Sequence, residues 1–400
     1  MRRWLLKRNL WQIKTQETKH LTSNFSYIVG GLTMQTVPEN RKVSPSLTFF
    51  TIHGMQFGIG ILGFQRLIAK KAGYDSWISV ILAGIATMMI MWMIYKILEI
   101  GKQDLAETHQ FIFGKLLGKA FNLLFISYFL LYIITILRTY TEIIQVWVFE
   151  DLNVFIFTLI YLSLCMYIVF GGFRTVVGMM FFSVALPSYL LILFSYTFEY
   201  ADFHHFLPIF DHSMKDIILA SHQMSLTYMG YEAFLIYSPF VKNTNQSKKW
   251  AYLALLVSLI MFLYTAVLTF GYFSEGMLQK YIWPTLTTWK IVHLPVVERF
   301  EYIGIANWCL IILPNTALAL WCGSRLIKQT FKITQKKGVL ILCAIPIIIV
   351  PFLKTRQQID ILNNVFGHLG FLINFIYIPF LIVLVWLAKK VKAKGYQRKT

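Results

Sequence analysis

Long runs of hydrophobic residues alternate with short polar connections along most of the chain. Many of these runs approach the roughly 20 residues that an α-helix needs to cross the ~30 Å hydrocarbon core of a bilayer. The pattern predicts an all-α polytopic membrane protein with ten transmembrane helices. We place them at residues 45–67, 76–98, 120–146, 153–170, 175–199, 217–240, 250–273, 302–327, 338–353 and 361–388.

The composition excludes a soluble domain. Of the 400 residues, 57% are hydrophobic and 14% are charged, and the mean hydropathy is +0.61; soluble domains contain about 45–50% apolar and about 25% charged residues. The four cysteines lie inside apolar runs, without the spacing of a metal site or a disulfide framework. The sequence contains no phosphate-binding loop or nucleophile elbow. We therefore expect no enzymatic activity, no catalytic residues, no cofactor and no metal.

The net charge of +19 is typical of a nucleic-acid-binding protein. The positions of the basic residues favour another interpretation. If the N-terminus is inside, the inner connections and both tails hold most of the 37 Lys and Arg residues and few of the 18 Asp and Glu residues. Such an excess marks the cytoplasmic side. The distribution predicts cytoplasmic termini and a lipid bilayer, not nucleic acid, as the partner. It divides the chain into a basic cytoplasmic lead (1–44), a transmembrane domain (45–388) and a basic cytoplasmic tail (389–400).

Ten spans divide into two sets of five, and the first span of each set is interrupted near its middle. Residues 54–63 of span 1 contain four glycines, and residues 225–232 of span 6 combine polar groups with Gly230 and Glu232. Matched interruptions indicate an inverted-repeat transporter core, a LeuT-like fold with broken helices 1 and 6. Gly54 and Gly58 also have the spacing of a helix-packing motif, so packing is the alternative interpretation.

A broken helix in a membrane leaves backbone polar groups that must be buried in protein or line a wet cavity. Its amides favour a carboxylate, and its carbonyls favour an ammonium group or a cation. The interruptions therefore predict a site near the middle of the membrane for a small ligand such as a zwitterionic amino acid. The candidate ligand-binding residues are Gly58, Ile59, Gly60, Thr227, Tyr228, Gly230, Glu232, Tyr128 and Asn307.

Glu232 is the strongest single candidate. Placing an ionisable group at the centre of a membrane costs at least ~2.5–3.5 kcal/mol of free energy, and such a group is usually functional. It is a candidate for proton coupling, for recognition of a ligand ammonium group, or for gating. The alternative is a protonated carboxyl group that hydrogen bonds to a neighbouring helix.

Further polar residues lie in spans 3 and 8. Arg138 and Glu142 are four residues apart near the outer end of span 3, so they share a helix face and are candidates for an ion pair or an outer gate. Asn307 and Asn315 are eight residues apart in span 8 and either line the cavity or hydrogen bond between helices. Weaker cavity candidates are Tyr132, His53 and Gln56.

Over residues 42–390, the chain resembles the B subunits of bacterial spore germinant receptors, a branch of the amino acid–polyamine–organocation transporter superfamily. The segments that carry the resemblance are 69–79, 138–142, 206–210, 230–232 and 238–240. The resemblance implies a ten-helix fold in the inner membrane of the spore and recognition of amino acids, sugars or nucleosides. It also implies assembly with an A subunit and a lipid-anchored C subunit.

Two features depart from the family. Gly178 and Phe181 stand where relatives often have an Arg and a Glu, which puts coupling through that charged pair in doubt. Residues 1–33 resemble no family segment, and we expect Met34 to be the natural start.

Three hypotheses follow. The first is a nutrient-sensing subunit of a germination receptor, in which the ligand favours a closed arrangement of the two helix bundles. The second is a proton-coupled amino acid symporter in which Glu232 carries the proton. The third is a structural membrane scaffold with a vestigial cavity.

Overall fold

The computed structural model describes residues 26–29, 32–35, 37–101, 104–292 and 298–397. It divides the chain into two units, Met1–Lys42 and Val43–Thr400. In the first unit, strands β1 (Ser26–Val29) and β2 (Leu32–Gln35) pair antiparallel, with Ser26 opposite Gln35, and a 3-10 turn, η1, covers Glu39–Arg41. The all-α prediction missed these strands. The expectation about residues 1–33 lies largely outside the described residues.

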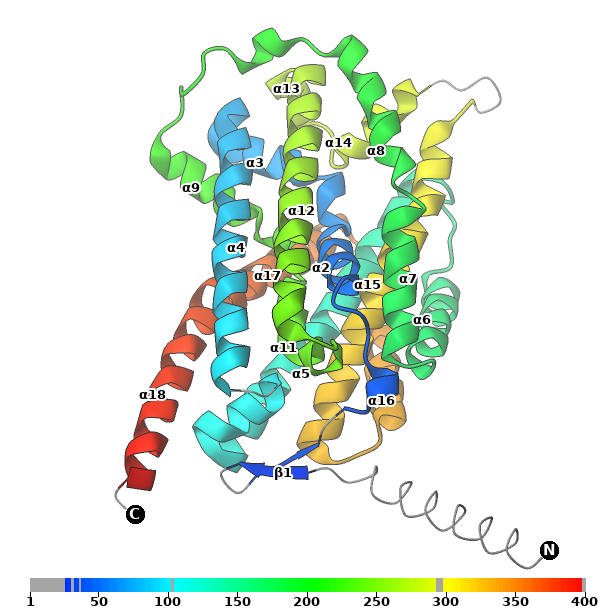
Figure 1. Cartoon of the computed structure of the whole chain (residues 1–400). Coiled ribbons are helices and arrows are strands. Elements are labelled where there is room, and N and C mark those ends of the chain that lie inside the picture. Colours follow the sequence, from blue (N-terminus) through cyan, green and yellow to red (C-terminus); the bar gives the residue numbers. More distant parts are fainter. Residues whose placement is uncertain (1–25, 30–31, 36, 102–103, 293–297, 398–400) are drawn as a thin grey trace, which may run out of the picture. The chain divides into compact units, whose positions relative to one another are not determined.

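The second unit is helical (Figure 1). Its first half contains α2 (Leu47–Gln56), η2 (Gly60–Leu62), α3 (Phe64–Ala72), η3 (Gly73–Asp75), α4 (Ser76–Gly101), α5 (Leu105–Trp147), α6 (Val154–Phe170), α7 (Phe173–Ala185), α8 (Tyr189–Phe194), η4 (Ser195–Tyr200) and η5 (Phe203–Phe206).

Its second half contains α9 (Met214–Gln223), α10 (Ser225–Tyr228), η6 (Tyr231–Ala233), α11 (Phe234–Tyr237), η7 (Ser238–Phe240), α12 (Thr244–Tyr272), α13 (Glu275–Leu278), α14 (Pro284–Thr288), η8 (Trp289–Ile291), α15 (Phe300–Phe331), α16 (Gln335–Ile349), η9 (Val350–Phe352), α17 (Arg356–Phe371), the π-helical turn η10 (Leu372–Tyr377) and α18 (Ile378–Gln397).

Among the described residues, seven helical segments are long and apolar enough to cross a membrane, and α6 is a shorter apolar helix. The segments predicted as spans 1 and 6 are not continuous helices. Span 1 divides into α2, η2 and α3, and span 6 divides into α9, α10, η6, α11 and η7. The polytopic α-helical class is confirmed, whereas the number of ten crossings stays a prediction.

The short helix α2 lies inside the bundle, between α12 and α7 and close to α15 (Figure 1). The long helix α15 packs along α5 and also contacts α16, α7 and α6. All seven residues from Thr51 to Phe57 are buried. The first interruption therefore lies in the protein interior, where only protein or a bound molecule can satisfy its polar groups.

Helix α5 starts well before the predicted span 120–146 because a sharp elbow at Gly114 joins two helical arms. Gly114 has φ +77°, a conformation that glycine adopts readily. A Cβ atom at Gly118 would lie 2.9 Å from Gln110, so the short arm folds closely against the long one. His109 connects the two arms and a third helix: Nδ1 lies 2.7 Å from Asn122 Oδ1, and Nε2 lies 2.5 Å from the hydroxyl of Tyr377.

Two other predicted spans contain local irregularities. Span 5 is interrupted between α7 and α8 at Pro187, which cannot continue the hydrogen-bond ladder of a helix. Span 10 contains the π-helical turn η10 between α17 and α18. Such turns in α-helices are frequent at functional sites.

Candidate functional site

The first interruption runs from Phe57 to Gly63. Helix α2 ends when the Phe57 amide donates to His53 O at 3.0 Å and ψ of Phe57 leaves the helical range. One 3-10 turn follows, in which the amides of Leu62 and Gly63 donate to Ile59 O and Gly60 O. Because a 3-10 turn has poorer hydrogen-bond geometry than an α-helix, this segment is the least regular part of span 1.

The second interruption is shorter and lies at Met229 and Gly230. Met229 is extended (ψ 169°), and Gly230 has φ +111°. The amide of Gly230 donates to Glu232 Oε2 at 2.8 Å, and the hydroxyl of Tyr128 donates to Glu232 Oε1. The Glu232 carboxyl group, with 1% of the residue exposed, therefore joins the break in span 6 to α5.

The two interruptions face each other. A Cβ atom at Gly60 would lie 2.9 Å from Thr227, and one at Gly230 would lie 2.8 Å from Met55. The amide group of Gln56 donates to Tyr228 O at 2.8 Å, which ties the end of α2 to α10. Only glycine permits both approaches, so the close contact between the two broken segments depends on the predicted glycines.

A cavity of about 70 Å³ lies beside this contact. Ile59, Gly60 and Thr227 from the two broken segments form its inner wall, and Arg356 and Asp360 lie at its other side. The two broken segments thus border a small cavity that holds a few water-sized groups, and its use as a ligand site stays a prediction.

Buried polar side-chain atoms without a hydrogen-bond partner in the described part of the chain also lie against the first interruption. Neither side-chain polar atom of Asn315 has a hydrogen-bond partner among the described protein atoms, and neither does Gln56 Oε1. Asn315 is fully buried, and its Nδ2 would lie 3.5 Å from a Cβ atom on Gly58. Because buried polar groups are almost always paired, an unpaired amide against an unwound segment indicates a place for a bound molecule or water.

An ion network borders the cavity at the predicted outer side. Glu142 Oε2 accepts from Arg356 Nη1 at 2.6 Å, and the same guanidinium group binds Asp360 through two nitrogens. The guanidinium group of Arg356 also lies 5.4 Å from the ring centre of Trp283. The predicted pairing of Arg138 with Glu142 is thus replaced by a pairing of Glu142 with Arg356, while Arg138 Nε donates to Leu353 O. Partners from α17 were not apparent from the spacing within span 3.

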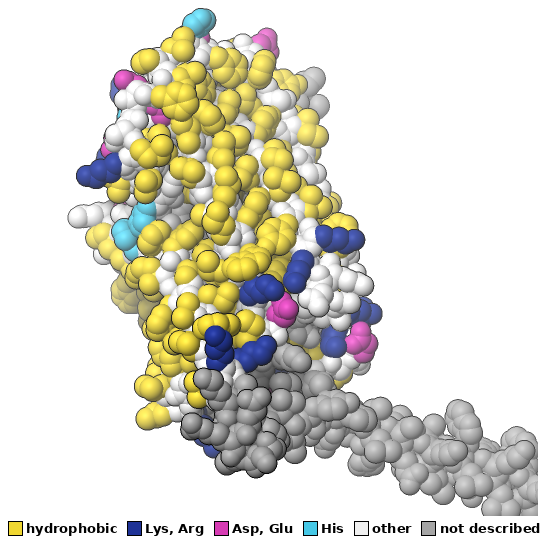
Figure 2. Space-filling model, turned by 60° about the vertical axis from the view of Figure 1, so that its left-hand side comes forward, with side chains coloured by type: hydrophobic (Ala, Val, Ile, Leu, Met, Phe, Trp, Pro, Cys, Tyr) yellow, Lys and Arg dark blue, Asp and Glu magenta, His cyan; other side chains and the backbone are white. Residues whose placement is uncertain are grey.

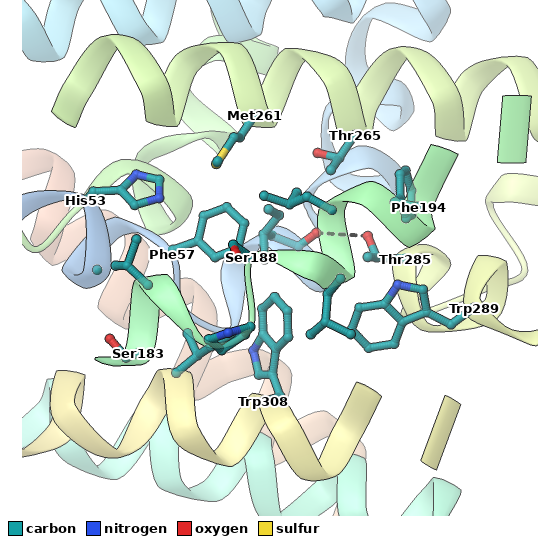
Figure 3. A pocket seen from close by; sticks show the side chains of 17 residues that line it. His53, Phe57, Ser183, Ser188, Phe194, Met261, Thr265, Thr285, Trp289 and Trp308 are labelled. Atoms are coloured by element: carbon teal, nitrogen blue, oxygen red, sulfur yellow. Dashed lines mark hydrogen bonds between the residues drawn. The ribbon is translucent and has the colours of Figure 1, made fainter. Parts of the chain in front are cut away.

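A second cavity, of about 60 Å³, lies behind the first interruption (Figure 3). His53 and Phe57 from span 1 and the indoles of Trp289 and Trp308 border it, with 5.7 Å between the two indole centroids. Thr285 donates to Ile61 O at 3.0 Å across its edge, so the loop helix α14 is attached to η2. The walls are almost entirely apolar, which suits a hydrophobic group rather than a charged one.

The structure brings most of the predicted site residues together but separates a few. Gly60, Ile59 and Thr227 line the outer cavity, Gly58 faces Asn315, and Gly230, Glu232 and Tyr128 form one hydrogen-bonded group. Tyr228 points its hydroxyl to Val80 O at 3.1 Å, toward α4. Asn307 is half-buried and donates to Ile303 O in its own helix at 2.9 Å, away from the interruptions.

Two functional candidates, Arg356 and Asp360, were missed by the sequence reasoning. The available signal was their position four residues apart just before the predicted span 10 (361–388), the spacing of an ion pair on one helix face.

Comparison with solved structures defines the class of protein. The chain is similar to Mhp1, a nucleobase-cation-symport-1 family transporter in a closed conformation with bromovinylhydantoin bound, at a TM-score of 0.57 and 12% identity, covering 84% of this chain and 78% of that one. It is similar to a Na⁺-coupled sialic acid symporter at a TM-score of 0.57 and 10% identity, covering 87% and 79%. The protein is thus a multi-pass membrane protein with the LeuT-like transporter fold.

Sequence comparison identifies the family. Residues 42–359 match the family of spore germination proteins. The chain is 39% identical over 361 residues to spore germination protein GerQB of Bacillus cereus, covering 90% of this chain and 99% of that protein. It is 21% identical to spore germination protein A2 of Bacillus subtilis (strain 168), covering 83% and 92%. The chain therefore belongs to the spore germination protein family, and the predicted resemblance is confirmed.

Proposed function

We propose that this membrane subunit of a spore germination receptor binds a small polar nutrient, of which an amino acid is the best fit, between the broken segments of spans 1 and 6. The observation that carries the proposal is the unpaired Asn315 amide against Gly58, next to the contact between Gly60 and Thr227. A ligand with both donor and acceptor groups would satisfy this amide without any charged side chain.

Binding would signal by favouring one arrangement of the two bundles. A ligand shifts a conformational equilibrium only by its difference in affinity for the two states. The outer network of Glu142, Arg356 and Asp360 is a candidate gate, since closing it over the cavity would separate the ligand from the outside. In this proposal, partner subunits of the A and C types receive the change, and both termini of this chain are cytoplasmic.

A proton-coupled symporter is the second candidate, and it rests on Glu232. Here the geometry favours a structural role for the carboxyl group, because its two oxygens already accept hydrogen bonds from Tyr128 and Gly230. Uptake into proteoliposomes that needs a pH gradient and is lost in Glu232→Gln would favour the symporter over the receptor.

The test compares two asparagines of α15. Binding of single amino acids, nucleosides and sugars to the purified chain is measured by calorimetry for the unchanged protein, Asn315→Leu and the control Asn307→Leu. We expect one compound class to bind and Asn315→Leu to weaken its binding at least about tenfold, which is about 1.4 kcal/mol. Asn307→Leu should bind as the unchanged protein does.

The melting temperatures of the two asparagine variants give an independent test. Burial of an unpaired amide costs free energy, and leucine removes that cost at a similar side-chain size, so the melting temperature of Asn315→Leu should not fall. Equal affinities in the two variants, or no binding of any compound to the unchanged protein, would contradict the proposed site.

A further inference from the structure

A groove of about 380 Å³ opens on the side of the helical unit, between α4, α9 and the junction of α17 with η10. Its walls are almost entirely apolar, and small residues of α4 such as Ala83 and Ala86 leave the space. The imidazole of His222 lies against the ring of Phe371, with 4.4 Å between centroids, so its ring face forms part of the wall. This groove is separate from the cavities beside the first interruption.

The mouth of the groove is continuous with the membrane-facing surface. Leu82, Ile218 and Leu219 line it and are 38%, 58% and 43% exposed. The side of the molecule brought forward in Figure 2 is covered mainly by hydrophobic side chains. In a multi-pass membrane protein this surface contacts acyl chains, so the groove opens to hydrocarbon rather than to water.

The depth of the groove agrees with these surroundings. Its α4 residues, Leu82 to Thr87, begin six residues after the start of α4 at Ser76. At 1.5 Å per residue this places them roughly 9–17 Å along the helix, within a hydrocarbon core of about 30 Å. The groove extends along α4 for only about 8 Å. A transmembrane helix of a partner would contact α4 along much more of its length, whereas a flexible chain fits a short recess.

The floor of the groove is the second interruption. Tyr228 and Met229, the two residues before Gly230, line it, together with Asn374 of the π-helical turn. A Cβ atom at Gly370 would lie 2.0 Å from Met229 Cε, so the Met229 side chain fills the space that this glycine leaves. An occupant of the groove would therefore contact the second interruption directly.

We propose that this groove is an acyl-chain site, in which one chain of a neighbouring phospholipid lies between α4, α9 and η10 against Tyr228 and Met229. An empty apolar groove loses dispersion contacts on the open side, and lipid chains are the molecules that surround it. The occupant adjusts the packing of the second interruption from the bilayer side. This inference does not depend on the proposed nutrient site.

The test maps lipid contacts on the full chain in phosphatidylglycerol liposomes that contain phosphatidylglycerol with a diazirine group in its acyl chain. After photolysis, labelled peptides are identified by mass spectrometry. We expect peptides of α4, α9 and η10 that line the groove to be labelled several-fold more than equally exposed apolar peptides of α6 and α16. Labelling in proportion to exposed surface would overturn the proposal.

Two variants of α4 sharpen the test. Ala86→Trp places an indole in the groove, and Ile85→Trp places the same side chain on the adjacent residue, which is 42% exposed and is not among the groove residues. We expect Ala86→Trp to lower groove labelling about fivefold and Ile85→Trp to leave it unchanged. Equal labelling in both variants would overturn the proposal.

In the assembled receptor, protection of the groove by a partner polypeptide would also overturn it. The map of the unchanged protein remains decisive if Ala86→Trp fails to fold.

Discussion

The two interruptions are built differently, although they occupy matching positions in the two halves of the chain. In the first, seven residues from Phe57 to Gly63 leave the regular helix, and the amide of Asn315 beside them has no protein partner among the described residues. In the second, five residues leave the regular helix, Met229 and Gly230 and the 3-10 turn η6, and the carboxyl group of Glu232 accepts bonds from Gly230 and Tyr128. At the first break the side-chain amide of Asn315 is left without a protein partner among the described residues, whereas at the second break both oxygens of the Glu232 carboxyl group accept a hydrogen bond. In the function proposed above, the ligand therefore pairs with Asn315 and not with Glu232.

The largest effect is expected when the second interruption is blocked. Gly230→Leu introduces a side chain at φ +111° and within 2.8 Å of Met55. Strain of about 1–3 kcal/mol from the backbone adds to about 1–3 kcal/mol from overpacking. We expect a large fall in melting temperature and loss of the germination response.

Gly178→Leu is the matched control for Gly230→Leu. A Cβ atom at Gly178 meets nothing within 4 Å, and its φ is not positive. This variant should melt and respond as the unchanged protein does. If both leucine variants behaved alike, the close approach of the two broken segments would not be the cause.

A smaller effect is expected from loosening the second interruption. Tyr128→Phe removes the hydroxyl donor to Glu232, and a buried acceptor that loses its partner costs about 1–3 kcal/mol. Melting temperatures of Tyr128→Phe, Glu232→Gln and the double variant form a double-mutant cycle. Strong coupling between the two positions is expected, while Tyr167→Phe, at a site 79% exposed, should change nothing. Additive effects would show that the Tyr128–Glu232 bond does not hold the break.

A substitution in the first interruption should lower the affinity for the nutrient and leave the stability of the protein unchanged. Gly58→Ala places a methyl group at ordinary contact distance, 3.5 Å from Asn315 Nδ2. The φ of Gly58 is not positive, and replacing glycine by alanine at a compatible backbone position lowers the entropy of the unfolded chain, so the melting temperature should not fall. Because the methyl group occupies space beside the free amide, nutrient affinity measured by calorimetry should fall about five- to tenfold. Unchanged affinity would place the ligand elsewhere.

The smallest effect is expected at the outer network. Arg356→Gln breaks the bonds to Glu142 and Asp360, and a partly exposed ion pair is worth about 0.2–1 kcal/mol. Stability should therefore change little. In a Cys309→Ser background, a cysteine introduced as Thr227→Cys should react faster with a membrane-impermeant maleimide when Arg356 is replaced by Gln. An equal rate with and without Arg356 would contradict a gate at this position.

The broken helices could be predicted from the sequence because clustered glycines inside an apolar run weaken the helix at a defined place. The partners of charged residues could not be predicted, because the spacing of residues along a helix identifies only pairs within that helix. Glu142 pairs with Arg356, which lies more than 200 residues away. Asn307 and Asn315 shared one predicted face, yet only Asn315 lies against the first interruption. The rotation of the helix about its axis decides which asparagine faces the interruption, and a single apolar sequence does not define that rotation.

Local backbone geometry was not predicted either. The elbow at Gly114 lies in the exposed connection before span 3, where a single glycine does not define the angle between two helical arms. The π-helical turn lies inside the apolar run of span 10, where hydrophobic periodicity indicates burial but not a local change of helix type. The hairpin in the lead was missed because four-residue strands are too short to show an alternating pattern.

The elbow in α5 also has a mechanical consequence. The long arm, from Gly114 to Trp147, is about 50 Å long at 1.5 Å per residue, and it carries Tyr128 near its middle and Glu142 near its far end. A 5° tilt about that far end would displace the elbow sideways by about 4 Å over this length. Because His109 bonds Asn122 of the long arm, the short arm would move with the long one, and because it also bonds Tyr377, the tilt would pull on η10. In such a tilt, a displacement below 1 Å beside Glu142 would correspond to a displacement of several ångströms at the elbow.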